Sequence, residues 1–371
     1  MAKVGIISMQ RIVNYGSFLQ AYGLKSLLEE MGHEVQFVDY HVGNSLVEGG
    51  TKHKNGIFSK VYKGLEALRY DASLKQKIQF IIYKKHFSKK YHGILGLTDK
   101  PNYNPKLDVL VIGSDEVFNC IQQNPNVGYS LELFGKNNNA KKVITYAASF
   151  GNTTVEKLKM YNVDREIGNL LNGIETISVR DQNSAEVVKT ISSKEVVYNL
   201  DPVLAYDFIK KCKLIPKKEK KEKYLILYAY SGRITSSESK WISTYAKNKG
   251  LKIYAIGGVQ KCADKFISCS PFEVLSYFKN ADEVITDTFH GTIFSIITER
   301  PFVTLVRKSV GESYGNEEKL TDLLSRLKLK NNIIYDLEEM NKVKTQEINY
   351  KEVEEILYLE RNKSIEYLRN I

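Results

Sequence analysis

A chain of 371 residues with 43% hydrophobic and 26% charged residues can bury one large or two ordinary cores, which excludes a largely disordered protein. The start, MAKVGIISMQ, lacks the apolar region of a signal peptide, and no apolar run approaches the roughly 18 to 20 residues that cross a bilayer, so we expect a cytoplasmic protein. A net charge of +11 favours anionic partners, but the basic residues are dispersed and no nucleic-acid-binding motif is present, so we expect no nucleic acid.

The first 40 residues predict a strand, a helix and a second strand. Residues 4–8 are apolar and β-branched, and the apolar residues after Ser17 recur at helical spacing as far as Gly32, a residue type that often ends helices. Residues 33–39 then alternate as a strand. This βαβ unit indicates a parallel sheet, and further strands are predicted at 107–113, 143–149, 176–179 and 196–200.

The second half repeats this rhythm. Strands are predicted at 224–230, 252–257, 283–287 and 302–306, with helices at 237–249, 271–280 and 290–298 between them. The preceding run PKKEKKEK has the composition of a linker. We therefore predict an α/β fold with two Rossmann-like domains, residues 1–205 and 206–345, whose parallel sheets face a cleft. A helical tail within residues 346–371 is expected to pack back on the first domain.

A basic and aromatic insertion, residues 51–92, interrupts the first domain. Its Lys and Arg residues alternate with apolar side chains in a helical pattern. One interpretation is helices packed on the first domain with a solvated lysine face. The other is peripheral contact with an anionic inner membrane leaflet.

The most informative strand-to-helix junction follows Asp287. Ligands of open α/β sheets bind beyond the carboxyl ends of the strands, and the free N–H groups of a helix start attract anions. Thr288 can cap the helix, Gly291 and Thr292 lie in its first turn, and His290 can bind phosphate or act as a general acid. The alternative is an ordinary cap with a packed histidine.

Three more junctions supply polar side chains. Arg180 ends a strand and suits a carboxylate or phosphate, although it could equally pair with Asp181 as a structural residue. Asp115 could orient or deprotonate a hydroxyl, or merely cap a helical turn. The remaining candidates sit in loops that could line the cleft: Ser114 beside Asp115, and Asn14, Tyr15, Gly16 and Ser17 in the first loop.

Several types of chemistry lack their sequence signals. The four cysteines, Cys120, Cys212, Cys262 and Cys269, have no metal-ligand spacing and read as reduced thiols. The sequence contains no P-loop, GxGxxG, HExxH or GxSxG motif and no carboxylate-rich metal cluster. We therefore predict neither a metal site nor a bound cofactor.

Together these junctions resemble the polysaccharide pyruvyl transferase family. The similar blocks are IISMQRIVNYGSFLQAYGL, VIGSDEVFN, TYAASFG, ISVRDQNSAEVV, LDPVL and TDTFHGTIFSIITERPFVTL. The resemblance implies a GT-B-like fold and places His290 and Arg180 at donor-binding or catalytic positions. It adds Ser149 as a cleft residue and Lys319 as a donor contact. Two departures are visible: Glu116 and Phe118 replace a Gln and a Trp, and Lys319 stands where an Arg is common.

The resemblance also implies a reaction, in the synthesis of exopolysaccharide or capsule for the bacterial cell envelope. Phosphoenolpyruvate would be the donor, and a sugar of a glycan or lipid-linked precursor the acceptor of a pyruvyl ketal. In this hypothesis His290 is the acid or phosphate ligand, Arg180 the anion clamp and Asp115 the base. Two alternatives remain open: a nucleotide-sugar-dependent glycosyltransferase on the same fold, and a non-catalytic scaffold of a glycan assembly complex.

Overall fold

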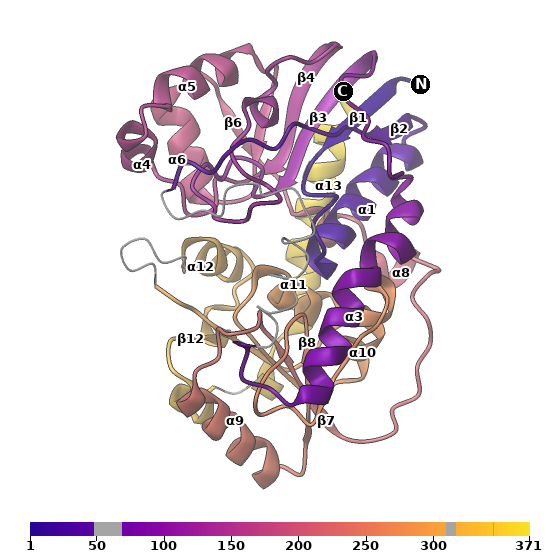
Figure 1. Cartoon of the computed structure of the whole chain (residues 1–371), viewed down its shortest axis with the longest axis vertical. Coiled ribbons are helices and arrows are strands. Elements are labelled where there is room, and N and C mark those ends of the chain that lie inside the picture. Colours follow the sequence, from indigo (N-terminus) through magenta and orange to yellow (C-terminus); the bar gives the residue numbers. More distant parts are fainter. Residues whose placement is uncertain (48–68, 309–316, 344) are drawn as a thin grey trace.

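The computed structural model describes residues 1–47, 69–308, 317–343 and 345–371, and it contains two six-stranded, all-parallel sheets (Figure 1). The first sheet has the strand order β2-β1-β3-β4-β5-β6. Its strands are β1 (Lys3–Ile7), β2 (Glu34–Phe37), β3 (Leu107–Asp115), β4 (Ala140–Ala148), β5 (Ile177–Val179) and β6 (Val196–Tyr198). Helices cover both of its faces: α1 (Tyr15–Glu30), α4 (Val155–Met160), α5 (Asp164–Gly173) and α6 (Gln182–Ile191).

The second sheet has the order β12-β11-β10-β7-β8-β9. Its strands are β7 (Tyr224–Tyr228), β8 (Lys252–Ile256), β9 (Lys265–Phe266), β10 (Glu283–Thr286), β11 (Phe302–Leu305) and β12 (Ile333–Ile334). Its helices are α9 (Ser236–Asn248), α10 (Pro271–Asn280), α11 (Phe289–Ile297) and α12 (Glu317–Arg326). Two short helices, α7 (Pro202–Ala205) and α8 (Phe208–Lys211), lie in the connection between the sheets.

The predicted fold class is confirmed: the chain is an α/β protein with two Rossmann-like, parallel sheets in a GT-B-like arrangement. Each predicted strand overlaps an observed one. The edge strands β9 and β12 were not predicted, because two residues are too few to produce a period-2 pattern. The boundary at residues 205 and 206 stays a prediction, and it falls between the end of β6 at Tyr198 and the start of β7 at Tyr224.

Local sequence explains where the helices begin. Asn14 caps α1, and its side chain accepts a hydrogen bond from the Gly16 N–H. Helices α9 and α10 both begin with a capping box, in which Thr235 pairs with Glu238 and Ser270 pairs with Glu273. These caps fix the helix starts close to the strand ends, which is the region that parallel α/β proteins use for ligands.

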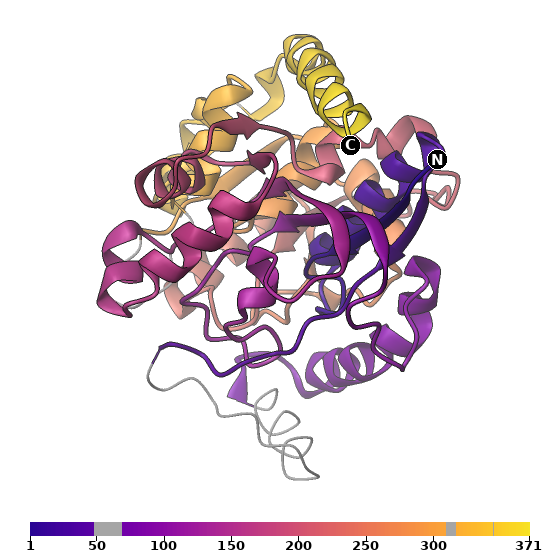
Figure 2. The same ribbon diagram turned by 90° about the horizontal axis from the view of Figure 1, so that it is seen from above.

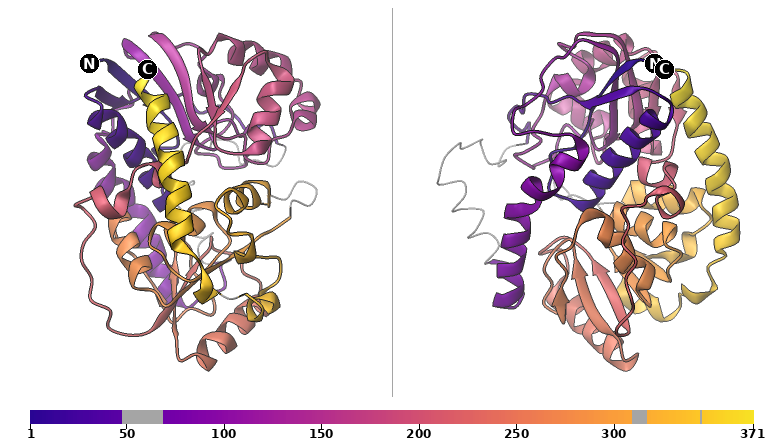
Figure 3. Two further views of the ribbon diagram at one scale, coloured as in Figure 1. Left: turned by 180° about the vertical axis from the view of Figure 1, so that it is seen from behind. Right: turned by 90° about the vertical axis from the view of Figure 1, so that its right-hand side faces the viewer.

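Two long helices connect the halves of the molecule from opposite sides (Figures 2 and 3). Helix α13 (Tyr350–Arg369) begins beside the second sheet, where the Tyr350 hydroxyl donates to the Arg300 carbonyl. It ends beside the first sheet, where the Ser364 hydroxyl accepts from the Leu200 N–H at 3.1 Å and the Tyr367 hydroxyl donates to the Thr145 carbonyl at 2.7 Å.

Helix α3 (Leu74–Tyr91) is the second connection and belongs to the insertion. Its Tyr83 ring packs against Tyr15 of α1 and against Phe266 of β9, so one helix contacts both halves. Residues 51–68 of the predicted insertion lie outside the described residues. Among the helices that the structure describes, none combines the length and apolar character needed to span a bilayer.

The return of α13 to the first sheet makes a testable prediction about stability. Leu368 near the carboxyl terminus is fully buried, whereas Leu359 of the same helix is 60% exposed. We expect Leu368→Ala to lower the free energy of unfolding by about 2 to 4 kcal/mol, because it leaves a cavity in the core. Leu359→Ala serves as the matched control and should change it by less than about 0.5 kcal/mol. Equal effects in chemical denaturation would show that the end of α13 does not stabilise the fold.

Candidate active site

A cavity of about 710 Å³ lies between the two halves. Its walls come from the carboxyl ends of strands in both sheets and from the loops that follow them. The first half contributes Asp115, the last residue of β3, and Arg180 after β5. The second contributes Tyr230 after β7 and Asp287 after β10. The cavity therefore occupies the position at which open parallel sheets bind ligands.

Two helices, one from each half, point their amino ends at this cavity. Asn14 and Ser17 at the start of α1 line it, as do Thr288, Phe289 and His290 at the start of α11. The Asn14 amide also donates to the Tyr230 hydroxyl at 2.6 Å, which joins the start of α1 to the loop after β7 in the second half. Since each helix carries a partial positive charge at its amino end, the converging starts favour an anion.

The start of α11 keeps part of its hydrogen-bonding capacity. Thr288 Oγ1 accepts from the Gly291 N–H at 3.0 Å, and the Thr288 carbonyl accepts from the Thr292 N–H. Within the described part of the chain, the Phe289 and His290 N–H groups have no acceptor. These two donors, rather than those of Gly291 and Thr292, are the ones left for an anion.

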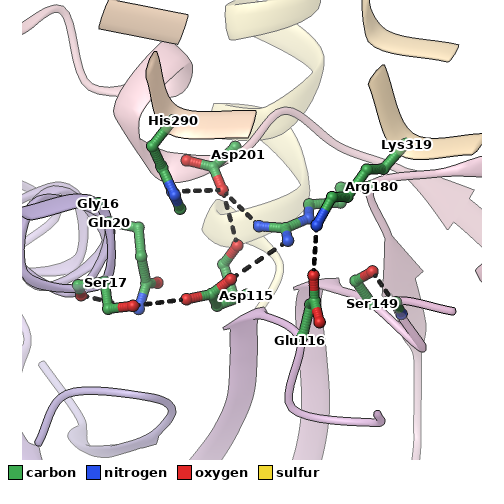
Figure 4. A network of polar contacts seen from close by, with 12 residues as sticks. Gly16, Ser17, Gln20, Asp115, Glu116, Ser149, Arg180, Asp201, His290 and Lys319 are labelled. Atoms are coloured by element: carbon green, nitrogen blue, oxygen red, sulfur yellow. Dashed lines mark hydrogen bonds and ion pairs between the residues drawn. The ribbon is translucent and has the colours of Figure 1, made fainter. Parts of the chain in front are cut away.

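Asp201 is the centre of a buried polar network (Figure 4). Its Oδ2 atom accepts from Arg180 Nη1 at 2.8 Å and from Ser114 Oγ at 3.3 Å, and it lies 3.7 Å from His290 Nε2. Burial by itself would raise the pKa of Asp201, but the contact with His290 and the charge of Arg180 outweigh burial and lower the pKa to about 2. A carboxylate at this point is therefore ionised and joins His290 of the second half to Arg180 of the first.

Asp115 occupies a second position on the same network. It accepts from Ser17 Oγ at 2.9 Å and from Arg180 Nη2 at 3.2 Å, and it lines the cavity. Its φ of +77° lies in the left-handed region, which is unfavourable for a residue with a side chain. Such strain is concentrated at sites where surrounding contacts hold a side chain in a functional position.

The imidazole of His290 lies against the first turn of α1. A Cβ atom added to Gly16 would come within 2.2 Å of the His290 ring, so no other residue at position 16 leaves space for it. Nε2 of His290 is buried and forms no hydrogen bond with the described residues, with Asp201 Oδ2 as its neighbouring carboxylate. The ring is thus fixed in place with one nitrogen ready for an incoming group.

Arg180 is a buried residue with several protein partners. Two of its nitrogens bond Asp201 and Asp115, and its guanidinium lies 4.3 Å from the centre of the Phe289 ring. The sequence suggested Asp181 as its structural partner. In the structure Arg180 instead bonds the carboxylates of Asp201 and Asp115 beside the cavity. Arg180 therefore both positions Asp115 and Asp201 and places a positive charge at the cavity wall.

Further charges border the cavity. Lys319 Nζ donates to Glu116 Oε1 at 2.6 Å, so two of the three positions that depart from the family pattern are in contact with each other. Arg233 stacks on the Tyr230 ring at 4.7 Å, and its Nη1 lies 3.8 Å from the buried carboxylate of Asp287. Burial raises the pKa of Asp287, and the two nearby arginines, Arg233 and Arg307, counteract this.

The structure separates the predicted site residues into two groups. Seven line the cavity: Asn14, Ser17, Asp115, Arg180, Thr288, His290 and Lys319. The other six do not: Tyr15, Gly16, Ser114, Ser149, Gly291 and Thr292.

Each residue of the second group has a structural task. Tyr15 donates to the Cys269 carbonyl between the halves, and Ser149 donates to Asp181 at 2.6 Å. The hydroxyl of Thr292 bonds the Thr288 carbonyl and Thr304. At Gly291 an added Cβ would meet Thr286 and Tyr228, so the glycine permits close packing of α11 on the sheet instead of close approach of a ligand.

The residues not predicted from sequence are Asp201, Tyr230, Arg233 and Glu116. Asp201 follows β6 and caps α7, so it has the same strand-end signal as Asp115, and it lies in the block LDPVL. Arg233 and Tyr230 lie in a loop without a motif, and only the fold shows that they face the cavity. No group of three or more metal-ligating side chains occurs in the part of the chain that the structure describes.

The fold and site define a two-domain α/β protein of GT-B-like architecture, with a cavity between its halves that two helix starts and several cationic side chains line. The chain belongs to the polysaccharide pyruvyl transferase family, whose model matches residues 14–309. It is accordingly a transferase. Comparison with curated protein sequences found no match.

Several solved structures are similar to this chain at low sequence identity. UDP-GlcNAc 2-epimerase of Methanocaldococcus jannaschii is 13% identical with a TM-score of 0.45, over 96% of this chain and 99% of that one. The UDP complex of MnaA from S. aureus is 14% identical with a TM-score of 0.45, over 96% and 95%. A Thermobaculum terrenum O-GlcNAc transferase is 10% identical with a TM-score of 0.40; the match covers 99% of this chain and 64% of that longer one.

The network around Asp201 makes a pH-dependent prediction. A carboxyl group has a pKa of about 3.9 in an unfolded chain, so the depressed pKa of about 2 means that ionised Asp201 stabilises the fold above about pH 4. This stability is lost as the pH falls through the folded-state value. We expect Asp201→Asn to lower the free energy of unfolding by about 2 to 3 kcal/mol at pH 7.

The free energy of unfolding of Asp201→Asn should then come closer to that of the unsubstituted protein as the pH of the denaturation experiment is lowered from 5 toward about 3. Asp99→Asn, at an exposed position outside the cavity, provides the control. A difference that stays constant over this range would mean that Asp201 is not held as an ion by Arg180 and His290.

Proposed function

We propose that this protein transfers the pyruvyl group of phosphoenolpyruvate to two hydroxyls of a sugar, forming a ketal and releasing phosphate. The observation that carries the proposal is the convergence of two helix starts, His290 and several cationic side chains on one cavity. Membership of the polysaccharide pyruvyl transferase family supports the same activity. No cofactor enters this proposal, and the reaction would take place in the cytoplasm.

Phosphoenolpyruvate carries a carboxylate and a phosphate, and the cavity offers separate groups for two anionic ends. The Phe289 and His290 N–H groups and the Thr288 hydroxyl suit the phosphate. The positive charges of Arg180, Arg233 and Lys319 surround the same space and suit the carboxylate. Lys319 would leave or share its contact with Glu116 when the donor binds.

The acceptor would occupy the part of the cavity formed by the first half. Its walls combine the apolar side chains of Met9 and Ile12 with the amides of Asn119 and Asn152. Sugars are bound by this combination, since amides donate to and accept from hydroxyls while apolar groups contact the faces of the ring. Asp115 lies between this region and Arg180.

The side chains fit a stepwise reaction. His290 donates a proton to C3 of the enol, which makes C2 electrophilic. A sugar hydroxyl adds to C2 and loses its proton to Asp115; the bond from C2 to the phosphate oxygen breaks, and phosphate leaves with the electron pair. A second hydroxyl then adds to C2, loses its proton to the neutral imidazole of His290 and closes the ketal, while the proton on Asp115 passes to the released phosphate. Asp201, as a positioning residue, lies 3.7 Å from Nε2 and orients the imidazole.

Replacing His290 tests its role as the acid. We expect His290→Asn to reduce the rate of phosphate release from phosphoenolpyruvate, with acceptor present, by about 100-fold or more, because a positioned acid contributes this much. The control His33→Asn lies outside the cavity and should retain activity. Unchanged turnover in the His290 variant would remove this residue from the mechanism.

The donor can be identified by thermal stabilisation. A ligand present at 100 times its dissociation constant stabilises the folded state by about 2.7 kcal/mol. We expect phosphoenolpyruvate to raise the melting temperature, and expect His290→Asn combined with Arg180→Gln to reduce that rise. Stabilisation by sugar nucleotides alone would indicate a glycosyltransferase instead. Full biological activity of the double variant would indicate a non-catalytic scaffold.

A further inference from the structure

Helix α3 has two faces of different character. The inward face carries Phe80, Tyr83 and Phe87, which are buried against α1 and β9. On the outward side, Leu74, Ile78 and Ile82 are 66%, 48% and 52% exposed. A single exposed aliphatic side chain is common in proteins, but three on one helix at intervals of four residues form a continuous apolar strip.

The same helix is strongly basic. Six lysines and no acidic residue occur between Leu74 and Tyr91. Four of these lysines form no ion pair with the described residues: Lys75, Lys85, Lys89 and Lys90. The neighbouring acidic group, Asp71, pairs with Lys261 and so does not neutralise the helix.

Helical geometry places these charges beside the apolar strip. At about 100° per residue, Ile78 and Ile82 lie about 40° and 80° around the axis from Leu74. Lys85 and Lys89 fall at about 20° and 60°, on the same outward face one to two turns farther along. The outward face thus begins apolar and ends basic, with no carboxylate on the helix to repel an anionic partner.

Helix α3 also borders the cavity, by its flank and not by its outward face. Lys84, at about 280° around the axis from Leu74, lines the cavity, and its Nζ donates to the Val13 carbonyl at 2.7 Å. Helix α3 runs along the edge of the molecule and alongside both halves (Figures 1 and 3). A surface that contacts the outward face would therefore be separated from the cavity by about the width of this helix, roughly 10 to 12 Å.

We propose that the outward face of α3 docks on the surface of an anionic lipid bilayer. Leu74, Ile78 and Ile82 enter the boundary between headgroups and acyl chains, while the lysines contact anionic headgroups. A second copy of this chain is a poor occupant, because two such lysine faces would repel each other. Delivery of a lipid-linked acceptor to the cavity would follow, and that consequence alone rests on the proposed function.

A comparison within the chain separates this face from ordinary exposed apolar residues. On α13, Tyr358 and Leu359 are 63% and 60% exposed, but Glu354, Glu355 and Glu360 lie on the same helix. Glu354 pairs with Lys210 and Arg361, and Glu360 pairs with Arg326 and Lys363, so acidic and basic groups balance on this helix. The pair on α13 is therefore a control with similar exposure but without the uniformly basic surroundings of α3.

Co-sedimentation with vesicles tests the proposal on the full chain. We expect binding to phosphatidylcholine vesicles that contain phosphatidylglycerol, little binding without it, and weakening by salt. The variant Ile78→Glu with Ile82→Glu should bind at least about tenfold more weakly, since it removes apolar contact and adds like charge. The control, Tyr358→Glu with Leu359→Glu, should bind as the unsubstituted protein does.

Three outcomes would overturn the proposal: no binding to anionic vesicles at low salt, equal binding by the Ile78 and Ile82 variant, or loss of a dimer in this variant by analytical ultracentrifugation. Phosphate release with a water-soluble acceptor is measured in parallel. Because neither Ile78 nor Ile82 lines the cavity, this activity should stay unchanged in the variant. A failed activity with intact vesicle binding would count against the proposed function and not against docking.

Discussion

The buried carboxylate of Asp201 is the interaction on which the site depends. It holds Arg180 at 2.8 Å and lies 3.7 Å from the imidazole of His290, so a charge in the first half fixes a side chain from the second. An isolated buried carboxylate would be costly, and it is tolerated here because cationic partners surround it. Without Asp201, Arg180 would have Asp115 as its remaining hydrogen-bonded carboxylate, and His290 would lose the negative charge that orients its ring.

The same region shows why the cavity needs both halves. The amino ends of α1 and α11 meet there, and the Gly16 backbone supports the His290 ring. Helices α3 and α13 connect the halves on opposite sides, which holds the two helix starts and the His290 ring at fixed positions relative to each other. An anion in the cavity would be bound by two helix dipoles at once, an arrangement that neither half could provide alone.

Much of this could be predicted from sequence, and the reasons are physical. Buried parallel strands are short apolar runs, so β1, β3 and β10 were recognisable, and the strand ends indicated Asp115, Arg180 and His290. The sequence could not show whether the small residues at these junctions contact a ligand or the protein. The structure places Gly291, Thr292 and Ser149 at the predicted junctions, but in contact with other protein groups. The reason is that packing across the whole core sets how each helix is rotated on its sheet.

Asp201 was overlooked for a related reason. In sequence it begins a stretch that reads as a connection between domains, and the contact with His290, 89 positions away, exists only once the two halves come together. The pairing of Glu116 with Lys319 is similar: each appeared as an isolated departure from the family pattern, whereas in space they form one ion pair. Contacts such as these, between residues far apart in the chain and on opposite sides of the cavity, cannot be predicted from a single sequence.

A crystal structure with phosphoenolpyruvate tests the central claim most directly. We expect the phosphate to lie within hydrogen-bond distance of the Phe289 and His290 N–H groups, with His290 Nε2 facing the enol carbon and Asp201 unchanged beside it. Ligand density elsewhere, or a His290 ring turned away from the ligand, would contradict it.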